Sequence, residues 1–270
     1  MSEGQVALIT GASSGIGLAI AELLASQGFR VFGASRHPEA TNLGYGSIRL
    51  DVRDDDSVRD CIATIVDTVG RIDVVVNNAV YALLGAIEET SIEEAKAIFE
   101  TNFFGAVRVT ATALPYMRAA QYGRIINIGV VLGFTPQPFG AFLASAKHAL
   151  AGYSTSLAFE VKPFGIEVSL VEPGFVKTNQ VNTLRIVQAP VNAYDEPRTR
   201  VVGAFRSSMA AGMSPRRVAG EVLRLLRSNA PKRRRRVGGT ATMLPYVQGL
   251  SPTAFFEGAL RKQNDIANGR

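Results

Sequence analysis

The stretch Thr10-Gly11-Ala12-Ser13-Ser14-Gly15-Ile16-Gly17 stands between a predicted strand and a predicted helix. The apolar run Val6–Thr10 is typical of a buried strand, and Ile16–Gln27 has apolar residues at helical spacing, up to Gly28. Glycines permit a tight turn close to a ligand, and a helix start offers unpaired N–H groups and a positive dipole end. The junction therefore predicts a pyrophosphate site formed by Gly11, Ser13, Ser14, Gly15, Ile16 and Gly17.

The alternation of apolar runs and amphipathic segments continues along the chain. Further strands are predicted at Arg30–Ser35, Ser47–Leu50, Ile72–Asn77, Arg124–Ile128 and Ile166–Val171. Helices are predicted at Asp54–Val69, Ile92–Thr101, Ala106–Ala120, Ala141–Lys162 and Pro215–Arg227. The pattern predicts an α/β, Rossmann-type doubly wound parallel sheet in a single domain, residues 1–270. We expect a mobile helical flap over the substrate at residues 179–212 and a C-terminal tail at 240–270.

The end of the second predicted strand indicates which nucleotide binds. It reads Ala34-Ser35-Arg36, where folds that prefer NAD usually place an acidic residue for the ribose hydroxyls. Ser35 leaves room for a 2′-phosphate, and the guanidinium of Arg36 can bind that group through a charge-assisted fork. We therefore expect NADP(H).

Composition and charge argue against several other classes of protein. The 270 residues are 47% hydrophobic and 19% charged, which is ordinary for a globular α/β chain. One cysteine, Cys61, and two histidines leave little for a disulfide framework or a metal site. The net charge of +6 owes five charges to the run Lys232–Arg236. A single run before Val237-Gly238-Gly239 is more typical of a solvated edge or a strand than of a nucleic-acid groove.

No segment predicts export or a membrane span. The N-terminal residues lack the basic start and long apolar stretch of a signal peptide. The uncharged segment Ile125–Ala146 is interrupted by glycines and prolines that a spanning helix would not tolerate easily. We expect a cytoplasmic protein that binds neither membranes nor nucleic acid.

Taken in order, the motifs resemble those of the short-chain dehydrogenase/reductase family over about residues 5 to 240. Beyond the glycine turn they are Asp51-Val52, Asn77-Asn78-Ala79, Asn102, Ile125–Ile128, Lys147-His148-Ala149-Leu150 and Pro173-Gly174-Phe175-Val176-Lys177-Thr178. The resemblance implies a nicotinamide cofactor whose adenine, riboses and carboxamide are held by Asp51, Val52, Asn78, Lys147, Pro173, Gly174, Val176 and Thr178.

The resemblance breaks at the pair with which the family reduces a carbonyl group. The family's tyrosine, a general acid, stands four residues before the lysine, one helical turn away, and its serine thirteen residues before the tyrosine. Here those positions hold Leu143 and Val130. Loss of the acid alone costs roughly 10²–10⁴-fold in rate. A further departure is Val80, where the family commonly has glycine, and its bulk is expected to narrow the cofactor crevice.

Two catalytic positions of the family are retained, and one replacement is considered. The resemblance implies that Asn102 supports a proton-relay water and that Lys147 acts beside the cofactor. Tyr81 follows the fourth strand at the carboxyl end of the sheet, where ligands bind, and is considered as a substitute catalytic group. Small residues within 141–162 permit close helix packing between subunits, so we expect a homodimer or homotetramer.

Val130 and Leu143 turn a polar centre into an apolar wall, which together with Tyr194 of the flap suits a hydrophobic small-molecule substrate. Three functions stay open. The favoured one is a non-redox catalyst of a cyclisation, pericyclic or isomerisation step on a natural-product-like substrate, with NADP(H) as a structural wall. The second is an NADPH-dependent oxidoreductase acting on an acceptor that is already activated, such as an iminium, quinone methide or activated alkene. The third is a non-catalytic NADP(H)-binding partner or sensor.

Overall fold

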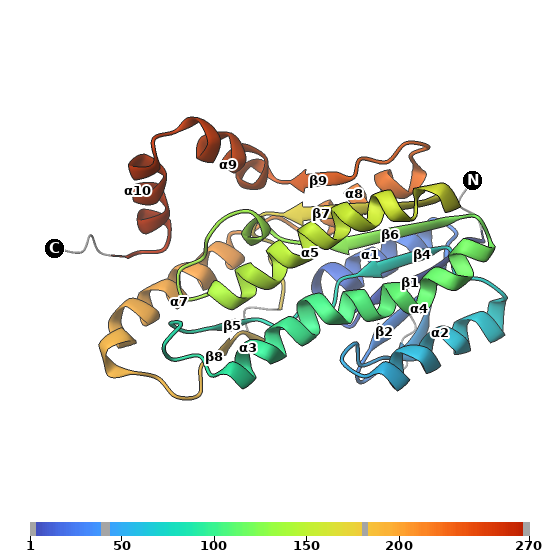
Figure 1. Ribbon diagram of the computed structural model, residues 1–270, viewed down its shortest axis with the longest axis horizontal. Coiled ribbons are helices and arrows are strands. Elements are labelled where there is room, and N and C mark those ends of the chain that lie inside the picture. The colour runs from blue at the N-terminus through green and yellow to red at the C-terminus, as the bar shows by residue number, and fades with distance from the viewer. Residues whose placement is uncertain (1–3, 39–43, 180–182, 267–270) are drawn as a thin grey trace.

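The computed structural model describes residues 4–38, 44–179 and 183–266. Within them a seven-stranded parallel sheet has the strand order β3-β2-β1-β4-β6-β7-β9, which confirms the predicted Rossmann-type fold (Figure 1). The strands are β1 (Val6–Thr10), β2 (Arg30–Ser35), β3 (Gly46–Arg49), β4 (Val74–Asn77), β6 (Gly123–Ile128), β7 (Ile166–Pro173) and β9 (Arg234–Val237). The helices are α1 (Gly15–Ser26), α2 (Asp55–Val69), α3 (Ile92–Phe99), α4 (Gly105–Ala119), α5 (Ala141–Glu160), α7 (Asp195–Ala210), α8 (Pro215–Arg227), α9 (Gly239–Leu250) and α10 (Thr253–Gln263).

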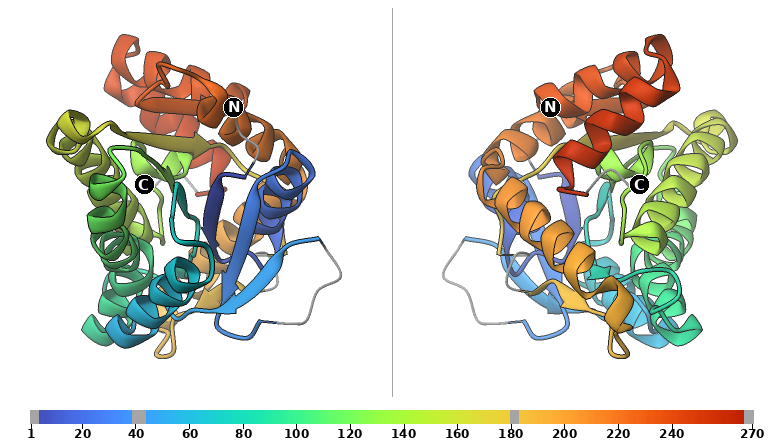
Figure 2. Two further views of the ribbon diagram at one scale, coloured as in Figure 1. Left: turned by 90° about the vertical axis from the view of Figure 1, so that its right-hand side faces the viewer. Right: turned by 90° about the vertical axis from the view of Figure 1, so that its left-hand side faces the viewer.

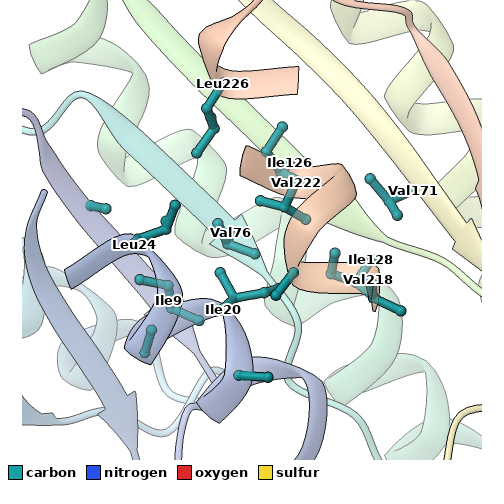
Figure 3. Packing of buried hydrophobic residues seen from close by; sticks show 14 of the residues in the cluster. Ile9, Ile20, Leu24, Val76, Ile126, Ile128, Val171, Val218, Val222 and Leu226 are labelled. Carbon is teal, nitrogen blue, oxygen red and sulfur yellow. The ribbon is translucent and has the colours of Figure 1, made fainter. Parts of the chain in front are cut away.

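Helices cover both faces of the sheet (Figure 2). On one face α1 and α8 pack side by side, and their apolar stripes meet the strands in the cluster that Figure 3 shows, with Ile20 and Leu24 from α1 and Val218 and Val222 from α8. On the other face α2, α4 and α5 enclose a second buried cluster. Because both faces are covered, the central strands β1 and β4 are almost continuously apolar rather than alternating, and both are buried along their whole length.

One predicted break between helices does not exist. The segment expected to end at Thr101 continues from α3 through a π-helix, Glu100–Phe104, directly into α4. A π-turn adds a residue to a helix without ending it, and such turns occur frequently at functional sites. It carries Asn102, which is buried.

The flap is docked on the body of the protein. Its described part, residues 183–212, contains β8 (Arg185–Ile186), which pairs with β5 (Leu83–Leu84), and the helix α7; residues 180–182 lie outside the described part. Glu89, fully buried, accepts hydrogen bonds from the Val191 N–H and from the guanidinium of Arg198 on α7. This buried charge pair joins the flap to the segment before α3.

Three arginines of the basic run, Arg234–Arg236, lie in the edge strand β9, and each faces a carboxylate of the protein. Arg234 makes a bidentate ion pair with Glu172 of β7, with both N–O distances 2.6 Å, and the Glu172 side chain is fully buried. Arg236 lies 3.7 Å from the same carboxylate, and Arg235 pairs with Glu221 of α8 at 2.8 Å. The alternation of a strand sends neighbouring arginines to opposite faces. The second half of the run thus belongs to an edge strand that two carboxylates hold in place.

Arg234→Met is expected to lower the free energy of unfolding by about 3 kcal/mol, the lower end of the cost of breaking a buried pair, because Arg236 still faces the carboxylate of Glu172. The control is Arg59→Met, whose pair with Asp56 is exposed and worth less than about 1 kcal/mol. Urea unfolding of the two variants checks this, and equal losses would contradict the assignment.

Candidate functional site

The glycine turn has the geometry of an anion site. Gly11 and Gly15 adopt φ values of 66° and 59°, in the region that favours glycine. A Cβ at Gly17 would overlap the carbonyl oxygen of Gly11 and the side-chain nitrogen of Asn78. Helix α1 begins at Gly15, and the Ser14 side chain makes no capping hydrogen bond, so the first N–H groups stay available to a ligand.

The ends of β1 and β4 hold this turn in place. The hydroxyl oxygen of Thr10 accepts hydrogen bonds from the N–H groups of Asn78 and Ala79, at 2.9 and 3.0 Å. The Asn78 amide donates in return to the carbonyl oxygens of Thr10 and Gly11, at 3.0 and 3.1 Å. Two adjacent strands are thereby locked together at the point where a ligand would approach.

A polar cleft opens over the turn and the ends of β2 and β3. It collects most of the residues predicted for the cofactor, namely Gly11, Ser13, Ser14, Gly15, Ile16, Arg36, Asp51, Val52, Asn78 and Thr178. Gly17 does not line the cleft, because it is packed beneath the turn. The free helix terminus, the crowded glycines and the exposed Arg36 fit a phosphate-rich nucleotide.

Asp51, expected at the adenine, has its carboxylate engaged within the protein. Both of its oxygens accept hydrogen bonds from the guanidinium of Arg53, at 2.9 and 2.6 Å. That contact lowers the pKa of Asp51 to about 2. Arg53 was not predicted, although its position two residues after Asp51 was visible in the sequence. It adds a second guanidinium to the lining of the cleft beside Arg36.

An apolar cavity adjoins the polar cleft, and Asn78, Val80 and Thr178 line both. Val130, Leu143 and Lys147 line it, together with the predicted cofactor residues Pro173, Gly174 and Val176. The remaining walls come from Ile16, Asn78, Val80, Ile128, Gly129, Val131, Leu132, Phe175, Thr178, Phe205 and Met209. Val80, which was expected to narrow the crevice, is 44% exposed and lines both hollows where they meet.

Tyr194 does not line the apolar cavity, contrary to the prediction. Its hydroxyl group donates to Glu88 at 2.8 Å, and its ring packs edge-on against Phe139. Tyr194 immediately precedes α7, whereas the cavity meets the middle and end of that helix. Phe205 and Met209, one helical turn apart, therefore occupy the wall that the flap was expected to supply through Tyr194.

Lys147 is the only titratable residue lining the described apolar cavity. It is buried on α5, one helical turn after Leu143, and its Nζ donates to the carbonyl oxygen of Ile128 at 3.1 Å. Burial disfavours the charged ammonium and lowers the pKa of Lys147 to about 8. Lys147 also lines a smaller polar hollow that contains Asn77 and Asn102.

Asn102 and Tyr81 are hydrogen-bonded to each other, and neither is among the residues that line the apolar cavity. The Asn102 amide donates to the carbonyl oxygens of Tyr81 and Ile98, at 2.7 and 2.9 Å, and its oxygen faces the Tyr81 N–H at 3.4 Å. The Tyr81 ring lines the polar cleft and lies beneath the guanidinium of Arg185. Tyr81 thus lies at the carboxyl end of the sheet as expected, in the polar cleft, and it is not among the residues that line the cavity of Val130 and Leu143.

The described residues were also compared with the requirements of a metal site and of a membrane-spanning helix. Across the described residues, no group of three or more histidine, cysteine, aspartate or glutamate side chains could hold a metal ion. In the same part of the chain, every helix is too short or too polar to cross a membrane.

Comparisons with known proteins agree with this geometry. Residues 5–188 match the family model described as short chain dehydrogenase. A 3-ketodihydrosphingosine reductase from Bacteroides thetaiotaomicron is 36% identical over 251 residues, 91% of this chain and 90% of that protein. A short-chain dehydrogenase structure from Streptomyces avermitilis has a TM-score of 0.80 and 32% identity, covering 97% of this chain and 98% of that one.

The same fold, at 21% identity, occurs in a short chain dehydrogenase/reductase from Burkholderia phymatum in complex with NAD, with a TM-score of 0.79 over 99% of this chain and 98% of that one. With a family model matched over most of its length and a relative similar from end to end, the chain belongs to the short-chain dehydrogenase/reductase family.

Proposed function

We propose that the protein is an NADPH-dependent oxidoreductase for an apolar substrate whose acceptor carbon is already electrophilic. The observation that carries this proposal is the composition of the apolar cavity, in which Lys147 is the only titratable group among the described residues. Val130 and Leu143 supply no hydroxyl group to polarise or protonate a ketone oxygen. The acceptor must therefore bring its own activation.

The polar cleft fits NADP(H), and different residues of the chain suit different parts of this cofactor. The turn from Gly11 to Gly17 suits the pyrophosphate, and Arg36 suits the 2′-phosphate. Thr178 lines both the polar cleft and the apolar cavity, and Lys147 lines the cavity, where the nicotinamide end belongs by family resemblance. When bound, this cofactor supplies a hydride.

The apolar walls bind and orient the substrate. Phe175, Phe205 and Met209 bury its hydrocarbon part and exclude water from the reacting carbon. Hydride addition to an iminium carbon neutralises the cation and needs no proton, so it proceeds without the tyrosine that the family uses. A quinone methide or an activated alkene likewise presents an electrophilic carbon.

The order of the candidate functions changes from the one that the sequence alone favoured. The Bacteroides relative is a reductase by name, which supports redox chemistry over a cyclisation or isomerisation. The non-redox catalyst remains the second candidate, because a cavity with one titratable group suits reactions that depend on shape and orientation.

Transfer of deuterium tests the proposal. The protein is incubated with NADPH carrying deuterium at the transferable position and a panel of apolar iminium ions, quinone methides and enones, and products are analysed by mass spectrometry. We expect one deuterium in the product. Product formed without deuterium, or formed equally well with oxidised cofactor, would favour the non-redox candidate.

Val130→Ser combined with Leu143→Tyr is expected to create ketone reductase activity. The tyrosine would stand one helical turn before Lys147 as a general acid, and the serine across the cavity as a hydrogen-bond donor. A gain of about 10²-fold or more in kcat/KM for an apolar ketone is expected, as acid catalysis supplies. Val131→Ser with Leu132→Tyr is the matched control, and a double variant no better than wild type would count against these positions.

Lys147→Met is expected to raise stability at pH 7 while removing function. The pKa of Lys147 is about 8 in the folded protein against an ordinary 10.5, so between these values the unfolded chain holds a proton that the folded protein has released. Wild-type stability therefore rises with pH across this window, and below it the full cost, on the order of 3 kcal/mol, is present. The advantage of the variant shrinks from pH 7 to pH 10 in urea unfolding. Exposed Lys96→Met shows no such trend, and a pH-independent advantage for Lys147→Met would exclude this explanation.

A further inference from the structure

We infer that Arg185, on the flap strand β8, is a cation for the pyrophosphate of the bound dinucleotide. This inference rests on the proposed function, because it takes NADP(H) as the ligand of the polar cleft. Arg185 lines that cleft together with Gly11, Ser13 and Arg36, although it is far from them in the sequence. No motif of the sequence pointed to it.

The backbone of Arg185 is fixed by strand pairing. Its N–H donates to the carbonyl oxygen of Ala82 at 3.0 Å, and the N–H of Val187 donates to that of Leu84 at 3.1 Å. Leu83 and Arg185 are register partners between β5 and β8. The flap therefore holds this residue at the cleft through a parallel ribbon rather than through a free loop.

The side chain of Arg185 is supported from below by an aromatic ring. Its guanidinium carbon lies 5.8 Å from the ring centroid of Tyr81, a distance suited to a cation–π contact. Asn102, in the π-helix, binds both the carbonyl group and the N–H of Tyr81. Through these contacts Asn102 positions Tyr81, and Tyr81 in turn positions the guanidinium of Arg185.

The positive charge of Arg185 is not neutralised by any carboxylate in the described part of the chain. Of the three arginines that line the cleft, Arg53 is paired with Asp51, whereas Arg185 forms no ion pair with any described residue. A guanidinium that lines a ligand cleft without a carboxylate partner suits a phosphoryl group, because its planar fork donates two parallel hydrogen bonds.

The strand order indicates that Arg185 contacts the pyrophosphate rather than the 2′-phosphate. Strand β1, which leads into the glycine turn, lies between β2 and β4. Arg36 follows β2, whereas Tyr81 and β5 follow β4 and β8 pairs with β5, so the segments that carry Arg36 and Arg185 come from opposite sides of β1 in the strand order. The 2′-phosphate belongs to the Arg36 side. Arg185 then faces the pyrophosphate that the turn receives.

Calorimetric titration with NADPH and with NADH separates the two arginines. We expect Arg185→Met to weaken the binding of both nucleotides about tenfold, the change that one charge-assisted hydrogen bond supplies. Arg36→Met is expected to weaken NADPH alone. Arg185→Lys should restore part of the affinity, and Tyr81→Leu should weaken both nucleotides by a smaller factor. The matched control is Arg118→Met, an exposed arginine near the end of α4, which removes the same charge and leaves both affinities unchanged.

Each other outcome overturns the inference in a distinguishable way. If Arg185→Met and Arg118→Met bind both nucleotides as wild type does, Arg185 is not a ligand of the cofactor, and the proposed function stands. A loss confined to NADPH would place Arg185 at the 2′-phosphate instead. If the wild-type protein binds neither nucleotide, the proposed function fails, and this inference fails with it. Thermal unfolding of each variant verifies that it is folded.

Discussion

The site depends on one close approach, between the glycine turn after β1 and the end of β4. Asn78 and Ala79 donate four hydrogen bonds to Thr10 and Gly11 across this junction. Gly17 leaves no space there for a side chain. If the two strand ends separated, the N–H groups at the start of α1 would no longer be oriented toward a ligand. The polar cleft lies over this junction and the apolar cavity beside it, and both are lined by Asn78. The junction thus sets the geometry of both binding regions.

Two buried charged residues, Glu172 and Lys147, differ in how their charge is compensated. Glu172 is fully buried but is neutralised by the bidentate contact with Arg234, so its charge secures the edge strand. Lys147 is buried among apolar walls with a single carbonyl oxygen as its partner, and its pKa falls for that reason. Uncompensated burial of a cation costs stability. Strongly shifted pKa values cluster at functional sites, which is consistent with the place of Lys147 in the wall of the apolar cavity.

The fold class, most element positions and the part of the cleft that carries motifs, from the glycine turn to Arg36, Asp51 and Asn78, were predictable from the chain. Helix α8 has the predicted bounds, and α1, α5 and β6 differ from theirs by at most two residues, because apolar periodicity and glycine stops act locally. The ribbon of β5 and β8 and the helix α9 were not predicted. Two-residue strands carry no periodic signal, and α9 buries only Ala241 among its residues, so no apolar stripe marks it.

The sequence by itself determined the family, the glycine turn after β1 and the place of Leu143 one helical turn before Lys147, since each of these is carried by residues that lie close together in the chain. Only the tertiary structure decided which parts of the flap meet which hollow. It placed Phe205 and Met209, rather than Tyr194, on the apolar cavity, and brought Arg185 over Tyr81. These contacts join segments about a hundred residues apart through a buried ion pair and a short strand pairing. The spacing of residues along the chain cannot predict such contacts, because the burial that stabilises them exists only once the chain has folded.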